Sequence, residues 1–201
     1  MITLSSKLGQ LLFIGIESTE LKDSEKKFIV ENNIGGVVLF GRNIKDLPTL
    51  LKLTTDIYNL KDKMPEKVPP FIGIDMEGGR VQRLKDPFTI WPAIRKLGDL
   101  DSASMAFELA ENMGQELKAA GISMNFAPSA DIFTNPKNEV IGDRSPGSDP
   151  ELVARVSSAL VRGFVKSGII PCVKHFPGHG DTLLDSHFDL PVQKEATLQS
   201  L

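Results

Sequence analysis

The sequence predicts an α/β protein in which helices cover a parallel sheet. Along its 201 residues, short apolar runs alternate with longer amphipathic segments, so strand and helix follow one another repeatedly. The apolar runs are continuous rather than alternating with polar residues, which is typical of strands buried on both faces of a parallel sheet. Two architectures fit this pattern, an open doubly wound sheet and a (β/α) barrel.

The first strands are short and closely spaced. A short helix is predicted at residues 6–12, ahead of the apolar strand LFIGI at residues 12–16. A second helix is predicted at residues 24–32, because Ser24 can cap it and charged residues open an amphipathic segment. The run VVLF at residues 37–40 follows as the second buried strand.

The third unit has the clearest helix signals of the N-terminal half. A helix is predicted at residues 46–60, because Asp46 suits the N-cap and Pro48 is tolerated in the first turn. The strand PFIGI at residues 70–74 follows and ends at Asp75.

The C-terminal half repeats the pattern with longer connections. Residues 78–100 are expected to be mostly irregular, because prolines interrupt them. The strongest helix is predicted at residues 102–120, where Gly121 ends it before a strand at residues 124–127. The remaining elements are a loop at 128–150, a helix at 150–166 and a strand at 169–173.

Composition excludes several classes of protein. The formal net charge of −3 leaves no electrostatic footprint for nucleic acid or an anionic membrane, so neither is expected as a partner. The single cysteine, Cys172, excludes an intrachain disulfide. The apolar run at residues 11–16 is too short to span a bilayer and lacks the flanks of a signal peptide. We therefore expect a cytoplasmic protein.

Polar residues gather where the predicted strands end. Asp75, Asp131, Lys174 and His175 lie at or just beyond the C-terminal ends of strands, and Arg144 lies in the loop after the fourth strand. Active sites of parallel α/β proteins form at this edge. Contributions from several separate strand ends favour the mouth of a barrel over the crevice of an open sheet.

All three histidines, His175, His179 and His187, lie within residues 174–191. Two residues before His187, Asp185 can accept a hydrogen bond from one imidazole nitrogen, which leaves the other free to give or take a proton. The crowding of histidines into one loop after a strand makes this proton-transfer reading about as strong as that of an incidental surface loop.

A metal site is the second interpretation of this loop. His175 and His179 are four residues apart, a spacing that brings two ligands together only on a helix. Pro177, Gly178 and Gly180 disfavour a helix here, so we predict no metal and no cofactor.

The basic residues are suited to an oxygen-rich ligand. Arg83, Arg144 and Lys174 can donate charge-assisted hydrogen bonds, and Asp75 can accept two from hydroxyl groups. This combination favours a neutral, polyhydroxyl ligand such as a sugar. For Arg80 we favour a structural ion pair.

Four motifs make the chain recognisable. It resembles the β-N-acetylglucosaminidases of glycoside hydrolase family 3, of the cell-wall-recycling type. The motifs are GIDMEGGRVQRL at 73–84, FAPSADI at 126–132, NEVIGDRS at 138–145 and KHFPGHGDTLLDSHFDLP at 174–191.

The resemblance implies a (β/α)8 barrel of the TIM type and the retaining hydrolysis of terminal β-linked N-acetylglucosamine, as in peptidoglycan turnover. The substrate would be an N-acetylglucosamine-containing glycan or muropeptide. Within the motifs, the residues implied to hold the sugar are Asp75, Arg83, Arg144, Lys174 and His175. Asp185 and His187 correspond to an acid/base dyad in which histidine replaces the usual carboxylic acid.

One part of the family pattern is missing. A retaining enzyme needs a nucleophile, and in this family it is an aspartate in a later barrel segment. Residues 1–201 account for only about the first five of eight β/α units, so we expect a partial N-terminal barrel domain, truncated at its C-terminus and inactive alone. A phosphorylase of the same family, a sugar-binding homologue without catalysis and a metal-dependent hydrolase remain alternatives.

Overall fold

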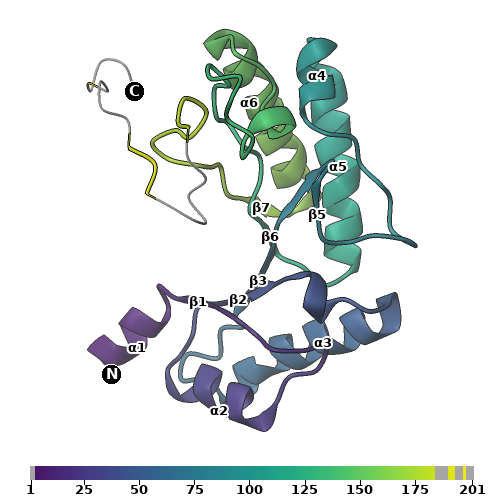
Figure 1. Cartoon of the computed structure of the whole chain (residues 1–201). Helices are drawn as coiled ribbons and strands as arrows, with labels where there is room; N and C mark the ends of the chain where they lie inside the picture. Colours follow the sequence, from purple (N-terminus) through teal and green to yellow (C-terminus); the bar gives the residue numbers. More distant parts are fainter. Residues whose placement is uncertain (1–2, 184–189, 193–196, 198–201) are drawn as a thin grey trace.

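The computed structural model describes residues 3–183, 190–192 and 197. Five parallel strands form one sheet in the order β1-β2-β3-β6-β7 (Figure 1). Their bounds are β1 Phe13–Gly15, β2 Gly36–Leu39, β3 Phe71–Ile74, β6 Met124–Asn125 and β7 Ile170–Pro171.

The strand order decides between the two candidate architectures. Each of the five strands lies beside the next one along the chain, without the reversal that marks a doubly wound sheet. Sequential parallel order is the topology of a (β/α) barrel. The predicted fold class, a TIM-type barrel of which about the first five units are present, is confirmed.

The register aligns the C-terminal ends of the strands. Leu39 of β2 lies opposite Ile74 of β3, and Ile74 lies opposite Asn125 of β6. Beyond β6 and β7 the pairing resumes as a parallel bridge between Ser129 and Lys174. The residues that follow the strands are thereby delivered to one edge of the sheet.

Helices connect the strands, and their caps follow the sequence closely. The α-helices are α1 Leu4–Gly9, α2 Asp23–Glu31, α3 Leu47–Asn59, α4 Arg95–Asp99, α5 Ala103–Ala119 and α6 Pro150–Ser167. Short 3₁₀ turns are η1 Gly41–Asn43, η2 Leu60–Lys63 and η3 Gly142–Arg144. As predicted, the Asp46 carboxylate caps α3 by accepting a hydrogen bond from Thr49 N at 2.8 Å. The cap predicted at Ser24 is wrong, because α2 begins at Asp23 and Glu25 accepts a hydrogen bond from Lys22 N at 2.9 Å instead.

The segment expected to be irregular contains regular structure. β4 (Met76–Gly78) and β5 (Val81–Gln82) form a small antiparallel hairpin directly after β3. Gly78 and Gly79 turn it with φ values of 89° and 57°, a region that glycine enters without strain. The residues that flank the two glycines pair with each other. The hairpin places Glu77 under the edge where the strands end.

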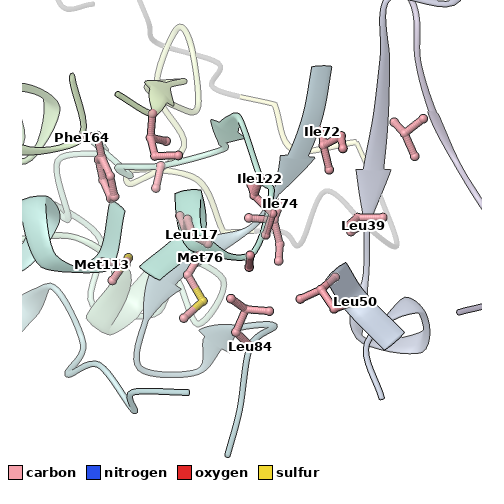
Figure 2. Close-up of a cluster of buried hydrophobic side chains, with 14 of the residues drawn as sticks. Leu39, Leu50, Ile72, Ile74, Met76, Leu84, Met113, Leu117, Ile122 and Phe164 are labelled. Carbon is pink, nitrogen blue, oxygen red and sulfur yellow. The ribbon is translucent and has the colours of Figure 1, made fainter. Parts of the chain in front are cut away.

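A single apolar core lies between the sheet and the helices. Figure 2 shows Ile74 on β3 with Leu117 of α5 and, nearby, Phe164 of α6. Helices α5 and α6 make the most extensive contact between elements in the described chain. Gly163 permits this close approach, because a Cβ there would lie 2.3 Å from the Phe107 carbonyl oxygen.

No helix in the described ranges is both long and apolar enough to cross a membrane.

The α5–α6 contact can be tested with Gly163→Ala. In an exposed helix interior this change stabilises by about 1 kcal/mol, because alanine has the higher helix propensity. Here we expect a loss of about 2 kcal/mol, because the new methyl group meets rigid backbone.

Thermal and urea unfolding would measure the effect. Gly41→Ala is the matched control, because a Cβ at Gly41 would meet no heavy atom within 4 Å in the described structure apart from its own chain neighbours. Equal or higher stability of Gly163→Ala would contradict the packing described here.

Candidate active site

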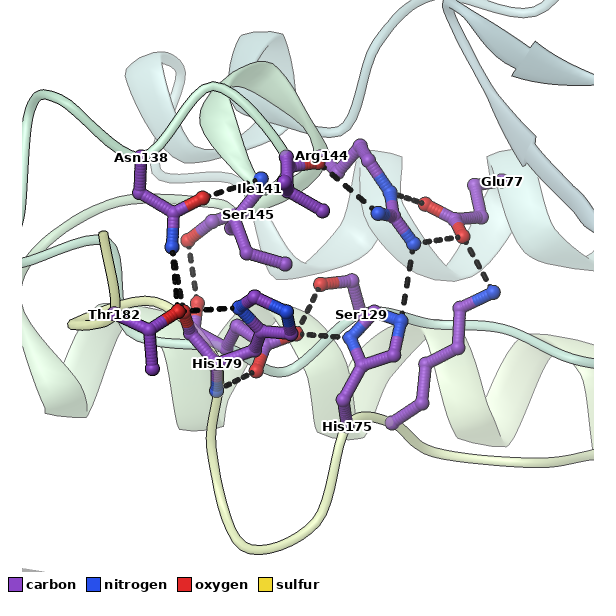
Figure 3. Close-up of polar contacts among 12 residues, drawn as sticks. Glu77, Ser129, Asn138, Ile141, Arg144, Ser145, His175, His179 and Thr182 are labelled. Atoms are coloured by element: carbon purple, nitrogen blue, oxygen red, sulfur yellow. Dashed lines mark hydrogen bonds and ion pairs between the residues drawn. The ribbon is translucent and has the colours of Figure 1, made fainter. Parts of the chain in front are cut away.

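Seven charged or titratable side chains meet at the C-terminal edge of the sheet, and we call them the polar cluster (Figure 3). They are Asp75, Glu77, Arg83, Asp131, Arg144, Lys174 and His175. They come from the ends of β3, β6 and β7, from the hairpin β4–β5 and from the turn η3. The structure therefore brings Asp75, Arg83, Arg144, Lys174 and His175 together, and their role in holding a sugar stays a prediction.

Glu77 is the innermost member of the polar cluster. It is 2% exposed and accepts two parallel hydrogen bonds from Arg144, Nε to Oε2 and Nη2 to Oε1, both at 2.8 Å. The Lys174 ammonium lies 2.5 Å from the same Oε1. Sequence reasoning gave Glu77 no role. Its only signal was an acidic residue within a buried apolar stretch, where a carboxylate requires partners.

Lys174 bridges two carboxylates. Its Nζ donates to Asp75 Oδ1 at 2.8 Å as well as contacting Glu77. Asp75 also faces Arg83, with 3.7 Å between its Oδ2 and the nearest guanidinium nitrogen. The buried Nε of Arg83 has no hydrogen-bond partner within the described part of the chain. The Asp75 and Arg83 side chains are partly exposed, so their outer polar atoms remain accessible to a ligand.

The geometry around His175 determines its tautomer. Nδ1 lies 2.6 Å from Asp131 Oδ2, and Nε2 lies 3.2 Å from Arg144 Nη2. A guanidinium only donates, so Nε2 accepts and the ring proton is on Nδ1. In this arrangement the Nε2 lone pair of His175 faces Arg144.

Asp131 is a buried carboxylate with three donors. It accepts hydrogen bonds from His175, from His179 N at 2.6 Å and from Ser129 Oγ at 2.9 Å. Burial acts to raise the pKa of Asp131, but these hydrogen bonds outweigh it and hold that pKa below its ordinary value of 3.8. Asp131 is therefore ionised at neutral pH.

Arg144 is also partly buried, with its charge stabilised by acids. Burial acts to lower the pKa of Arg144, but Glu77, together with the charges of Asp131 and Asp75, raises it above its usual value. Arg144 therefore stays cationic.

The loop after β6 holds Arg144 in place from behind. Asn138 donates from Nδ2 to His179 O at 2.6 Å and accepts from Ile141 N at 2.9 Å. Ser145 Oγ donates to Asp131 O at 2.6 Å. Figure 3 shows the Asn138 amide directed towards the segment of His179 and Thr182, and this hydrogen bond joins the loop after β6 to the one after β7.

One sequence-derived interpretation, that of Arg80, is decided by these contacts. Arg80 pairs with Asp143 at 3.0 Å and donates to the carbonyl of Val140 at 2.7 Å, so its predicted structural role is confirmed. His179 Nδ1 lies 2.7 Å from Thr182 Oγ1. No group of three or more His, Cys, Asp or Glu side chains in the described residues is placed to hold a metal ion. The dyad predicted at Asp185 and His187 lies outside the described residues.

Asp131→Asn tests how much the ionised Asp131 carboxylate stabilises the fold. A folded pKa below 3.8 means that ionised Asp131 stabilises the fold above about pH 3.8 and that this stability is lost as pH falls through the folded pKa. We expect Asp131→Asn to unfold about 2 kcal/mol more easily at pH 7, because its amide cannot accept three donors.

The deficit should shrink as the pH falls below 3.8 towards the lowered folded pKa of Asp131, because the wild type then loses the stability that the ionised carboxylate contributes. Urea midpoints between pH 7 and pH 3 would measure it, with Asp143→Asn in the half-exposed Arg80 pair as the control. A deficit that stays constant across this range would contradict the account.

Comparison with known proteins places this geometry in a family. Residues 3–201 match the glycosyl hydrolase family 3 N-terminal domain. A β-hexosaminidase of Thiobacillus denitrificans is 39% identical over 193 residues, covering 93% of this chain and 52% of the relative. The chain spans about half the length of most of the curated relatives it matches.

Solved structures agree. A family 3 β-N-acetylglucosaminidase from a Paenibacillus species superposes with a TM-score of 0.88 at 46% identity, covering 95% of this chain and 36% of that one. NagZ from Neisseria gonorrhoeae in complex with N-trifluoroacetyl-D-glucosamine gives 0.82 at 37% identity, covering 90% and 53%. The chain therefore belongs to glycoside hydrolase family 3, and it corresponds to the N-terminal domain of that family.

Proposed function

We propose that the protein is a retaining β-N-acetylhexosaminidase that releases terminal β-linked N-acetylglucosamine. The polar cluster is the observation that carries this proposal. The outer polar atoms of Asp75 and Arg83 are accessible to a ligand, and Arg144, Lys174 and His175 border them at the same edge. Paired acceptors and donors at a barrel mouth fit the hydroxyl and acetamido groups of a neutral sugar.

The relatives support the substrate class. The Paenibacillus protein is a β-N-acetylglucosaminidase, and the Neisseria protein was solved with an N-acylated glucosamine. By the same likeness we propose a glycan or muropeptide substrate. We also propose a role in peptidoglycan recycling, by the resemblance to cell-wall-recycling members, and a cytoplasmic location.

We assign proton transfer to Asp185 and His187. His187 would protonate the leaving oxygen and then deprotonate the attacking water, and Asp185 would orient the imidazole. The described start of their loop is anchored on the loop after β6: Thr134 Oγ1 donates to Asp181 Oδ1 at 2.9 Å, and Asn138 donates to His179 O. These two hydrogen bonds fix the described start of the loop beside the polar cluster, which supports the assignment of the dyad to this site.

We place the nucleophile in barrel units beyond residues 1–201. Within the described residues, β1 and β7 each pair with one neighbour only, and a TIM-type barrel has eight strands. We propose that further β/α units complete the barrel and supply an aspartate nucleophile. By "the complete protein" we mean residues 1–201 together with those units.

Hydrolysis of a chromogenic β-N-acetylglucosaminide by the complete protein tests the proposal. We expect turnover that needs no phosphate, resists chelators and first releases the β-anomer of the sugar, as retention requires. Residues 1–201 alone should give no turnover, because the nucleophile is missing.

His187→Ala in the complete protein is the matched variant. We expect kcat to fall by roughly 10²–10⁴ for alkyl glycosides and much less for dinitrophenyl glycosides, whose leaving oxygen needs little protonation. An equal fall in kcat for all leaving groups would show that His187 is not the general acid. Dependence of turnover on phosphate would favour a phosphorylase. Sugar binding without turnover would favour a non-catalytic homologue, and inhibition by a chelator would favour a metal-dependent hydrolase.

A further inference from the structure

Glu77 is placed so that it cannot itself bind the sugar. Its side chain is 1% exposed, against 10% for Arg144 and 15% for Lys174, so it lies beneath both cations. Its Oε2 accepts from Arg144 Nε, and its Oε1 is shared by Arg144 Nη2 and Lys174 Nζ. Any influence of Glu77 on a ligand must therefore act through Arg144 and Lys174.

These contacts fix the two cations side by side. Without Glu77, a guanidinium and an ammonium this close would repel each other. Both cations would then be attracted to the remaining carboxylates, Asp75 and Asp131. The two parallel hydrogen bonds also set the plane of the Arg144 guanidinium, which fixes the Nη2 that faces His175. Glu77 thus determines where Arg144 and Lys174 present their remaining hydrogen-bonding capacity.

Glu77 also decides the net charge of the polar cluster. Arg83, Arg144 and Lys174 contribute three positive charges, and Asp75, Glu77 and Asp131 contribute three negative charges. These six charges sum to zero. Neutralising Glu77 would leave one positive charge, borne by the partly buried Arg144 and Lys174, where solvent screens it weakly.

We propose that Glu77 is a positioning residue that orients Arg144 and Lys174 and cancels their excess charge, so that the site selects a neutral sugar over an anion. The inference rests on the proposed function for the identity of the sugar. It adds the residue that sets charge selectivity, which excludes phosphorylated or carboxylated sugars at the same position.

The test compares two ligands in the complete protein: N-acetylglucosamine, which is neutral, and inorganic sulfate, whose charge does not change with pH. Binding is measured by calorimetry at constant ionic strength. Wild type should bind the sugar, and sulfate should not compete with it. Competition by sulfate as effective as that of the sugar would overturn the proposal without any variant.

Glu77→Gln keeps the shape of the side chain and removes its charge. We expect sugar affinity to fall roughly 10- to 100-fold, because a charged hydrogen-bonding partner is lost, and sulfate affinity to rise at least about tenfold. Glu77→Asp keeps the charge with a shorter reach, so it should weaken sugar binding without gaining sulfate binding. Glu116→Gln is the control, because Glu116 is a carboxylate that accepts from Thr89 N and Trp91 Nε1 instead.

A purely structural role for Glu77 predicts a different result. The melting temperature would then fall, and affinity for both ligands would fall together in Glu77→Gln, which would overturn the proposal. If wild type neither turns over substrate nor binds N-acetylglucosamine, the proposed function fails. Even then, comparing the sulfate affinity of Glu77→Gln with that of the wild type tests whether Glu77 cancels the excess positive charge.

Discussion

The buried ion pairing of Glu77 with Arg144 and Lys174 is the interaction on which the site depends. Charges removed from water are stable only when each finds close partners of opposite sign. Three distant segments must therefore meet: the hairpin after β3, the turn η3 and the end of β7. Their convergence couples the active edge to the fold, because each segment reaches the cluster only if its strand is in register.

The topology of the sheet brings these three segments together. Parallel strands in sequential order release every following residue at the same edge, and the Ser129–Lys174 bridge extends the register into the loops. The α5–α6 contact then holds β6 and β7 against the rest of the core. The outer members Asp75, Arg83 and His175 remain partly exposed above this support.

Much of this arrangement could be predicted from sequence, because strand ends follow from continuous apolar runs and charged residues after them share one edge. Asp75, Lys174 and His175 were located in this way, and the motifs added Arg83 and Arg144. Glu77 was not located, because its importance arises from contacts with Arg144 and Lys174, which are 67 and 97 residues away along the chain. Ser24 was assigned a cap that Glu25 makes unnecessary, since the Glu25 side chain reaches back to Lys22 N. The pairing of β4 with β5 depends on a tight glycine turn whose flanking strands are too short to show a periodicity.

The crystal structure of the complete protein with bound N-acetylglucosamine tests the central claim most directly. The account predicts sugar oxygens within hydrogen-bonding distance of Asp75 and Lys174, and at the Arg144–His175 side, while both oxygens of Glu77 stay on Arg144 and Lys174. A sugar that contacts Glu77 directly, or that binds away from the polar cluster, would contradict it.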